Sequence, residues 1–151
     1  MALDRHREAV AAVYVRYCDI VDDKAFDRLD EVFTADTIGD YRQAYGPDAV
    51  RTGLAELIAL FHRNLGPGSN CGATHHNVGN FAIEIDGDRA HARVNYHAVH
   101  RGVRDHAGAL YAMWGRYDDI LVRTAAGWRI AERRYRTDLT QGPVVTSAPG
   151  D

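Results

Sequence analysis

Apolar residues in the first 65 positions repeat at helical spacing. Residues 1–22 carry one apolar stripe, whose steps of three residues and one residue are typical of an amphipathic helix. The same pattern predicts a short helix over 24–33 and a third helix over 54–65. Asp22 lies at the junction of the first two helices, and residues 37–42 are expected to form a short strand.

From Ala73 onward the apolar period changes to two residues, which is typical of strands. Four antiparallel strands are expected, near 74–85, 89–101, 108–123 and 128–137. Three helices followed by such a sheet predict an α+β fold with the helices on one face of the sheet. Residues 1–140 are expected to form one domain, and the aperiodic residues 141–151 a tail that lies over the surface or is disordered.

Length and charge narrow the class of function. A chain of 151 residues fits one compact domain, and 18 Lys and Arg against 21 Asp and Glu give a net charge of -3. We therefore expect neither a nucleic-acid partner nor a membrane surface as partner. The basic start of the chain is not followed by the apolar run of a signal peptide, which favours a cytoplasmic protein.

The sequence lacks the common motifs for metals, nucleotides and serine nucleophiles. It contains no HExxH, GxGxxG or GxSxG, and Cys18 and Cys71 fit no metal-ligand spacing. We therefore expect no metal site and no cofactor.

Histidines are the main functional signal, because six of the eight fall between His75 and His106. In the strand near 89–101 the even positions share the face toward the helices, so His100 is expected to point inward. The pair His75 and His76 stays open, because Gly79-Asn80 could form a bulge that reverses which residues face inward.

Four segments, taken in order, carry a resemblance to a known family. They are DDKAFDRLDEVFTADTIGDYR, THHNVGN, VNYHAVH and GWRIAERRYRTD. Over about residues 5–140 the chain resembles the SnoaL-like branch of the nuclear transport factor 2-like superfamily, which includes scytalone dehydratase, related dehydratases and a dehydrochlorinase. The resemblance implies a cone-shaped α+β barrel. In it a strongly bent, mostly antiparallel sheet wraps around three N-terminal helices and leaves a pocket at the wide end.

The resemblance also implies roles for particular residues. In the dehydratases a histidine, oriented by an aspartate from the end of the first helix, abstracts a proton from carbon. These roles fall to His76 and Asp22, and that of a second pocket histidine falls to His100, with His97 as the alternative. Tyr41 matches a tyrosine that polarises the substrate carbonyl through water. Substrate-binding roles are implied for Tyr17, Tyr45, Trp114 and Arg136.

These residues predict a cofactor-independent lyase. We expect a dehydratase whose substrate is a cyclic or aromatic polyketide-like or steroid-like intermediate, and therefore a small hydrophobic molecule. Imidazole, with an ordinary pKa of about 6.5, suits proton abstraction near neutral pH. Tyr41 would donate to the developing oxyanion, and His100 would act as the acid for the departing group.

Two other functions are compatible with the same pattern. A polyketide cyclase or isomerase would use the same pocket. Resemblance to the cyclases of this family implies an aspartate in the second half of the sheet, a place that Asp118, Asp119 or Asp138 could fill. A non-catalytic ligand-binding or assembly module would reuse the fold without chemistry. In each case we expect a homodimer or homotrimer that pairs through the outer face of the sheet.

Several of these residues also have a purely structural interpretation. Asp22 could cap the second helix, and Tyr41 could be an ordinary residue of the sheet. Arg136 could be a surface cation, and Trp114 a residue of the core or of a subunit interface.

Overall fold

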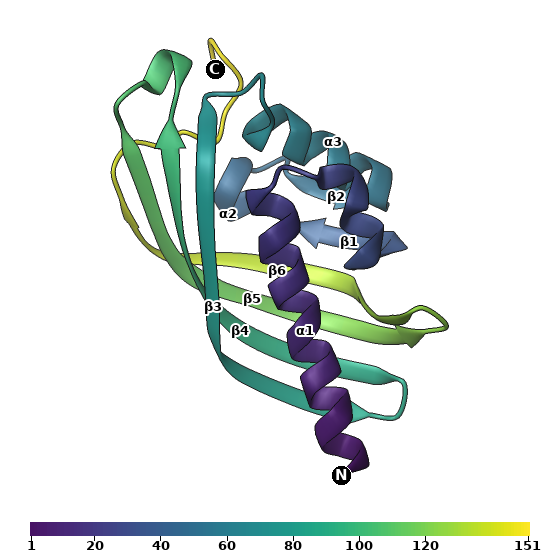
Figure 1. The fold of residues 1–151 in the computed structure, drawn as a ribbon. Helices are drawn as coiled ribbons and strands as arrows, with labels where there is room; N and C mark the ends of the chain where they lie inside the picture. Colours follow the sequence, from purple (N-terminus) through teal and green to yellow (C-terminus); the bar gives the residue numbers. More distant parts are fainter.

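The computed structural model describes all residues, 1–151. Its helices lie on one side of the core and its curled sheet on the other (Figure 1). The helical elements are α1 (Ala2–Asp22), η1 (Phe26–Glu31), α2 (Arg42–Tyr45), α3 (Leu54–Leu65) and η2 (Arg104–His106). The strands are β1 (Phe33–Asp40), β2 (Val50–Thr52), β3 (Cys71–Asp86), β4 (Arg89–Gly102), β5 (Leu110–Thr124) and β6 (Gly127–Gln141).

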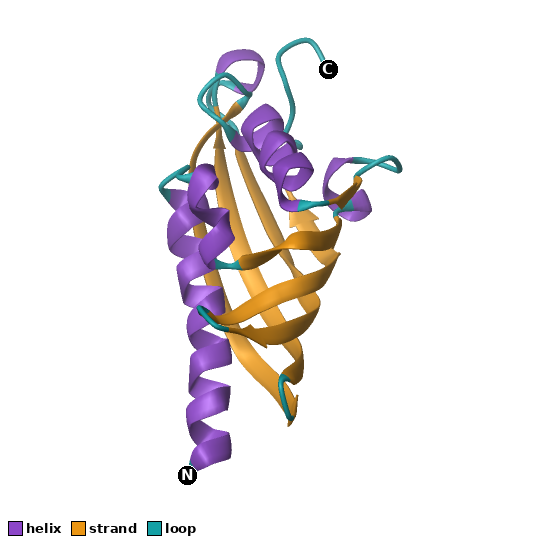
Figure 2. Ribbon diagram, turned by 90° about the vertical axis from the view of Figure 1, so that its right-hand side faces the viewer, coloured by secondary structure: helices purple, strands orange, loops and turns teal.

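The strands form one six-stranded sheet in the order β2-β1-β6-β5-β4-β3. The β1–β6 pair is parallel and all other pairs are antiparallel. The sheet curls around α1, and α3 lies at the end opposite the N-terminus (Figures 1 and 2). This arrangement confirms the expected cone-shaped α+β fold.

The periodicity of the sequence explains which faces meet. The apolar stripe of α1 is buried, and so are the even positions of β4 from Ala90 to His100. In β5 the odd positions from Tyr111 to Leu121 are buried in the same way. The core therefore lies between α1 and the concave face of the sheet. No helix is long and apolar enough to cross a membrane.

Several element boundaries differ from the prediction. The second helix is a shorter 3-10 helix, and β1 begins four residues earlier and ends before Tyr41. Parallel pairing with β6 fixes β1, since Thr37 Oγ1 lies within 3.2 Å of the carbonyl oxygens of Ile130 and Ala131. Such long-range pairing leaves no local signal in the sequence. The short elements α2, β2 and η2 were not predicted.

The last ten residues follow β6 and pack against the wide end of the cone. Val145 is completely buried, and the Ser147 carbonyl accepts a hydrogen bond from the Asn70 backbone N–H at 2.9 Å. Arg63 on α3 pairs with Asp151 at 2.9 Å. The tail therefore lies over the surface, one of the two states expected, but with a buried anchor.

Candidate active site

A bulge in β3 decides which of the two adjacent histidines points inward. The pairing of β3 with β4 is interrupted between Gly79 and Ala82, and Asn80 adopts a positive φ of 51°. Before the bulge even positions face the helices, and after it odd positions do. His76 therefore points inward and His75 is exposed.

Asp22, at the end of α1, is bonded to three groups of β3. Its carboxylate accepts hydrogen bonds from Thr74 Oγ1 at 2.8 Å, the His76 backbone N–H at 3.0 Å and His76 Nδ1 at 2.6 Å. Burial alone would raise the pKa of Asp22, but the hydrogen bonds from His76 and Thr74 lower it below its ordinary value. The carboxylate is therefore ionised. It does not cap η1, whose N-cap residue is Ala25.

The bond to Asp22 fixes the role of each His76 nitrogen. Because a carboxylate only accepts, Nδ1 carries the proton, and in neutral imidazole Nε2 is then left with a free lone pair. The His76 side chain is only 7% exposed and lines an internal cavity. An imidazole held in this tautomer by a carboxylate can act as a general base.

His100 lies beside His76, with ring centroids 5.4 Å apart, and is 4% exposed. Neither of its ring nitrogens has a hydrogen-bond partner within the protein. Burial, followed by the nearby His76 and Lys24, lowers the pKa of His100 to about 3. The ring is therefore neutral near pH 7. This corrects its expected role as an acid: a neutral imidazole can donate a hydrogen bond to a leaving group but holds no extra proton to give.

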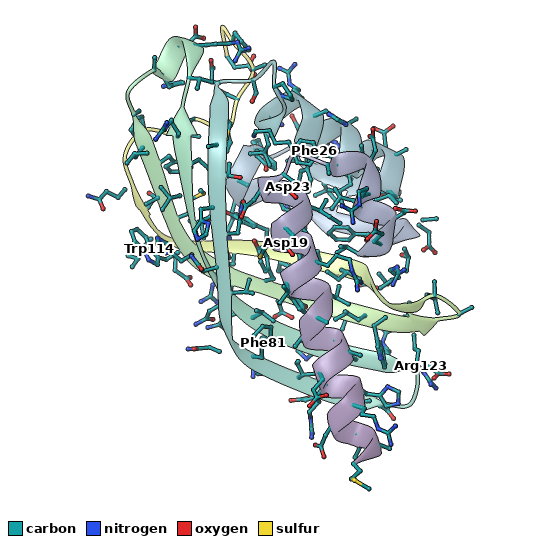
Figure 3. All side chains as sticks on the ribbon, viewed as in Figure 1. Asp19, Asp23, Phe26, Phe81, Trp114 and Arg123 are labelled. Carbon is teal, nitrogen blue, oxygen red and sulfur yellow. The ribbon has the colours of Figure 1, made fainter.

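The alternative histidine, His97, does not reach the cavity. Its ring stacks on Trp114 with centroids 4.9 Å apart and planes within 8°. Figure 3 shows Trp114 on the side of the sheet away from the helices. The prediction that Trp114 lines the pocket was wrong, because its even position in β5 faces outward.

Arg136 also lies outside the cavity. It is half exposed and pairs with Asp138 at 2.8 Å. It neighbours the buried Tyr135 in β6 and therefore faces the opposite side of the sheet. It was expected in the pocket and does not line it, and its position is that of the surface interpretation.

The cavity is lined mostly by aromatic side chains. Seven of the eight tyrosines take part, including Tyr17, Tyr41 and Tyr45, as predicted from the resemblance. The full lining is Tyr17, Tyr41, Ala44, Tyr45, Leu65, His76, Tyr96, Ala98, His100, Tyr111, Met113, Tyr117, Tyr135 and Thr146. The free space that admits the centre of a water molecule is about 20 Å³. That is room for roughly one water.

A buried ion pair behind this cavity was not predicted. Arg133 and Asp119 face each other across β6 and β5, and neither side chain is exposed. The alternation of β5 from Tyr111 to Leu121 places Asp119 inside and could have revealed it. Arg133 could not be placed this way, because the β5–β6 register shifts between Ile120 and Leu121.

None of the three aspartates considered for a cyclase lines the cavity. Asp119 is bound to Arg133 and Tyr14, while Asp118 pairs with His91 and Asp138 with Arg136. No three His, Cys, Asp or Glu side chains converge in a way that would hold a metal ion.

Solved structures of other proteins have the same fold. A Kribbella flavida protein superposes with a TM-score of 0.83 at 26% identity, over 92% of this chain and 95% of that one. A candidate scytalone dehydratase of Novosphingobium aromaticivorans gives 0.77 at 21% identity, over 95% and 93%. The hexachlorocyclohexane dehydrochlorinase of Novosphingobium barchaimii gives 0.77 at 16% identity, over 97% of both chains.

Sequence comparison identifies the family. An uncharacterized protein of Mycobacterium tuberculosis is 34% identical over 132 residues, which are 84% of this chain and 82% of that protein. The family model of the SnoaL-like domain matches residues 5–134. The chain therefore belongs to the SnoaL-like family.

Proposed function

We propose that this protein is a lyase that needs no cofactor and eliminates water from a cyclic or aromatic ketone. The observation that carries the proposal is the Asp22–His76 hydrogen bond of 2.6 Å at the wall of an enclosed aromatic cavity. A general base must be oriented and shielded from bulk water, and this pair meets both conditions.

The proposed reaction uses four side chains. His76 Nε2 takes the proton from the carbon next to the substrate carbonyl, and Asp22 stabilises the imidazolium that forms. The electron pair moves onto the carbonyl oxygen, which accepts a hydrogen bond from Tyr41. The electron pair then returns from the carbonyl oxygen and a C=C bond forms. At the same time the C–O bond at the next carbon breaks, while His100 donates a hydrogen bond to the leaving oxygen. His76 returns its proton to that oxygen, which leaves as water.

The fold neighbours support elimination as the reaction type. The names of two neighbours, a candidate scytalone dehydratase and a dehydrochlorinase, both denote elimination. At 21% and 16% identity they share the fold with this chain, so the argument for chemistry rests on the dyad itself. The cyclase alternative loses support, because none of Asp118, Asp119 and Asp138 lines the cavity.

The small free space favours one other function. Because only about 20 Å³ of the cavity admits the centre of a water molecule, a ring-sized ligand enters only if lining side chains move. A filled pocket is also what a non-catalytic assembly module would have, so the test has to separate the two. The expected homodimer or homotrimer stays a prediction.

Proton exchange tests the base without knowledge of the leaving group. The protein is mixed with bicyclic ketones in D₂O, beginning with 2-tetralone, and loss of the α-proton signal is followed by NMR. We expect catalysed exchange that falls about 10²–10⁴-fold in His76→Ala and in Asp22→Asn. His75→Ala, which changes the exposed neighbour, is the matched control and should exchange at the original rate.

Unchanged exchange in His76→Ala would remove the base assignment. If the unaltered protein catalyses no exchange with any ketone of the series, the assembly module becomes the better explanation.

A further inference from the structure

We propose that Arg133 and Asp119 form a buried positioning pair, which holds Tyr41 as the hydrogen-bond donor for negative charge on the substrate oxygen. The inference rests on the proposed function. It adds to the site two residues that do not touch the cavity and act only through Tyr41.

The pair is anchored by several short contacts inside the core. Arg133 Nη2 and Nε donate to Asp119 at 2.8 and 3.1 Å, and Tyr14 donates to Asp119 Oδ2 at 2.9 Å. Neither charged side chain is exposed. The guanidinium carbon also lies 4.0 Å from the ring centre of Tyr117 and 4.3 Å from that of Tyr17. Such contacts with aromatic faces stabilise the cation and hold it in place.

The third guanidinium nitrogen of Arg133, Nη1, contacts a residue of the cavity wall. This nitrogen donates to the Tyr41 hydroxyl oxygen at 3.2 Å, and the Tyr17 hydroxyl lies 3.4 Å from the same oxygen. Because Arg133 occupies a lone pair of that oxygen, the Tyr41 proton is directed to Tyr17 or into the cavity. The Tyr41 ring stacks between Tyr45 and Tyr135, at 5.9 and 5.5 Å, which fixes its direction.

Charge behind the phenol strengthens it as a donor. Burial raises the pKa of Tyr41, so the hydroxyl stays protonated, and the Arg133 charge acts in the opposite direction. A cation bonded to the phenol oxygen draws electron density from its O–H and therefore favours donation to an oxyanion. Asp119 keeps the cation in the core without reaching Tyr41 itself.

Stability alone explains the pair poorly. Replacing a buried ion pair with apolar residues of similar volume is often neutral or stabilising, so a core could be built here without these charges. The bond from Arg133 to a cavity residue is the feature that apolar replacements would not supply.

A phenol that changes colour on ionisation tests the donor directly. We would titrate 4-nitrophenol bound to the protein, following the visible absorption of its anion, in the original chain and in Tyr41→Phe. Removing Arg133 alone would leave Asp119 as a buried charge without a counter-ion. The two residues are therefore replaced together, as Arg133→Met with Asp119→Leu. Circular dichroism checks that each variant is folded, and Arg133→Lys provides a second variant that keeps the charge inside.

We expect the bound phenol to ionise at lower pH in the original protein than in water. Its pKa should rise by about one unit, a tenfold change in the anion-to-phenol ratio, in Tyr41→Phe and in the paired replacement. Combining the two changes should add nothing further, because the pair acts through Tyr41. A lysine at position 133 keeps the charge but lacks the planar guanidinium that bonds Asp119 and Tyr41 together. Arg133→Lys should therefore give a phenol pKa between those of the original protein and the paired replacement.

The matched control is Arg136→Met, which removes an exposed arginine from the same strand and should leave the titration unchanged. Additive effects of the two changes, an unshifted titration in the paired replacement, or failure of 4-nitrophenol to bind as the anion would each overturn the proposal. His76→Ala separates this outcome from that of the proposed function, since it should slow proton exchange about 10²–10⁴-fold but keep the phenol shift.

Discussion

His100 shows how one buried side chain links the site to stability. Its folded pKa of about 3 lies below the ordinary value of 6.5. Between these two values the unfolded chain binds a proton that the folded chain does not, so stability falls as the pH is lowered through this range. The neutral His100 imidazole, which could donate a hydrogen bond to substrate, thus makes the fold less stable in acid.

We predict that His100→Leu removes this part of the acid sensitivity. At pH 5 the histidine should cost the folded state about 2 kcal/mol relative to pH 7.5, and the variant should lose this difference. Urea unfolding at the two pH values measures it. His75→Leu removes an exposed histidine instead and should keep the pH dependence of the original chain. The same slope in His100→Leu would contradict neutral burial of His100.

At the residue scale, the prediction of the site depended on whether the side chains of each strand alternate between its two faces without interruption. The uninterrupted alternation of β4 was enough to place His100 inward. Trp114 and Arg136 were assigned from motif similarity, which carries no information on which face of a strand a residue occupies. Their own strands place both outside, and Arg133 takes the interior.

At the element scale, the bulge in β3 depends on a backbone conformation that few residues tolerate. Asn80 has a positive φ of 51°, a region in which asparagine is favoured and β-branched residues are strongly disfavoured. The side chain itself is exposed, so its contribution comes from the backbone.

We therefore predict that Asn80→Val destabilises the protein by roughly 1–2 kcal/mol, although valine ordinarily favours strands. Asn80→Gly should be close to neutral. Gly79→Ala is the control, because nothing lies within 4 Å of an added Cβ and φ is not positive there. Equal stability of Asn80→Val and the original chain in urea would show that the bulge does not need this conformation.

Elements with a long, regular apolar period were predictable, and those fixed by distant partners were not. The stripe of α1 and the alternation of β4 and β5 follow from local sequence. The ends of β1 depend on β6, almost a hundred residues later in the chain, and the single turn α2 has no periodicity to detect. Tyr41 lies between β1 and α2, so its assignment to the site came only from the resemblance.

At the scale of the whole molecule, the C-terminal tail completes the wide end of the cone. The tail supplies Thr146 to the cavity wall and buries Val145 completely. Its neighbour Val144 is 52% exposed, so adjacent residues of one type differ in burial.

We predict that Val145→Asp releases the tail, because an unpaired carboxylate is costly to bury. Limited proteolysis followed by mass spectrometry should detect faster loss of the C-terminal residues. Val144→Asp places the same charge on the exposed neighbour and should leave cleavage at its original rate. Equal cleavage of both variants would mean that Val145 does not anchor the tail.

The position of this anchored segment has a practical consequence for handling the protein. The two chain ends lie at opposite ends of the cone, with the N-terminus at its narrow tip (Figures 1 and 2). An affinity tag fused after Asp151 would be attached directly to the residue that pairs with Arg63, only a few positions from Thr146. A tag placed before Met1 keeps purification handles and crystallisation linkers far from the chemistry to be assayed.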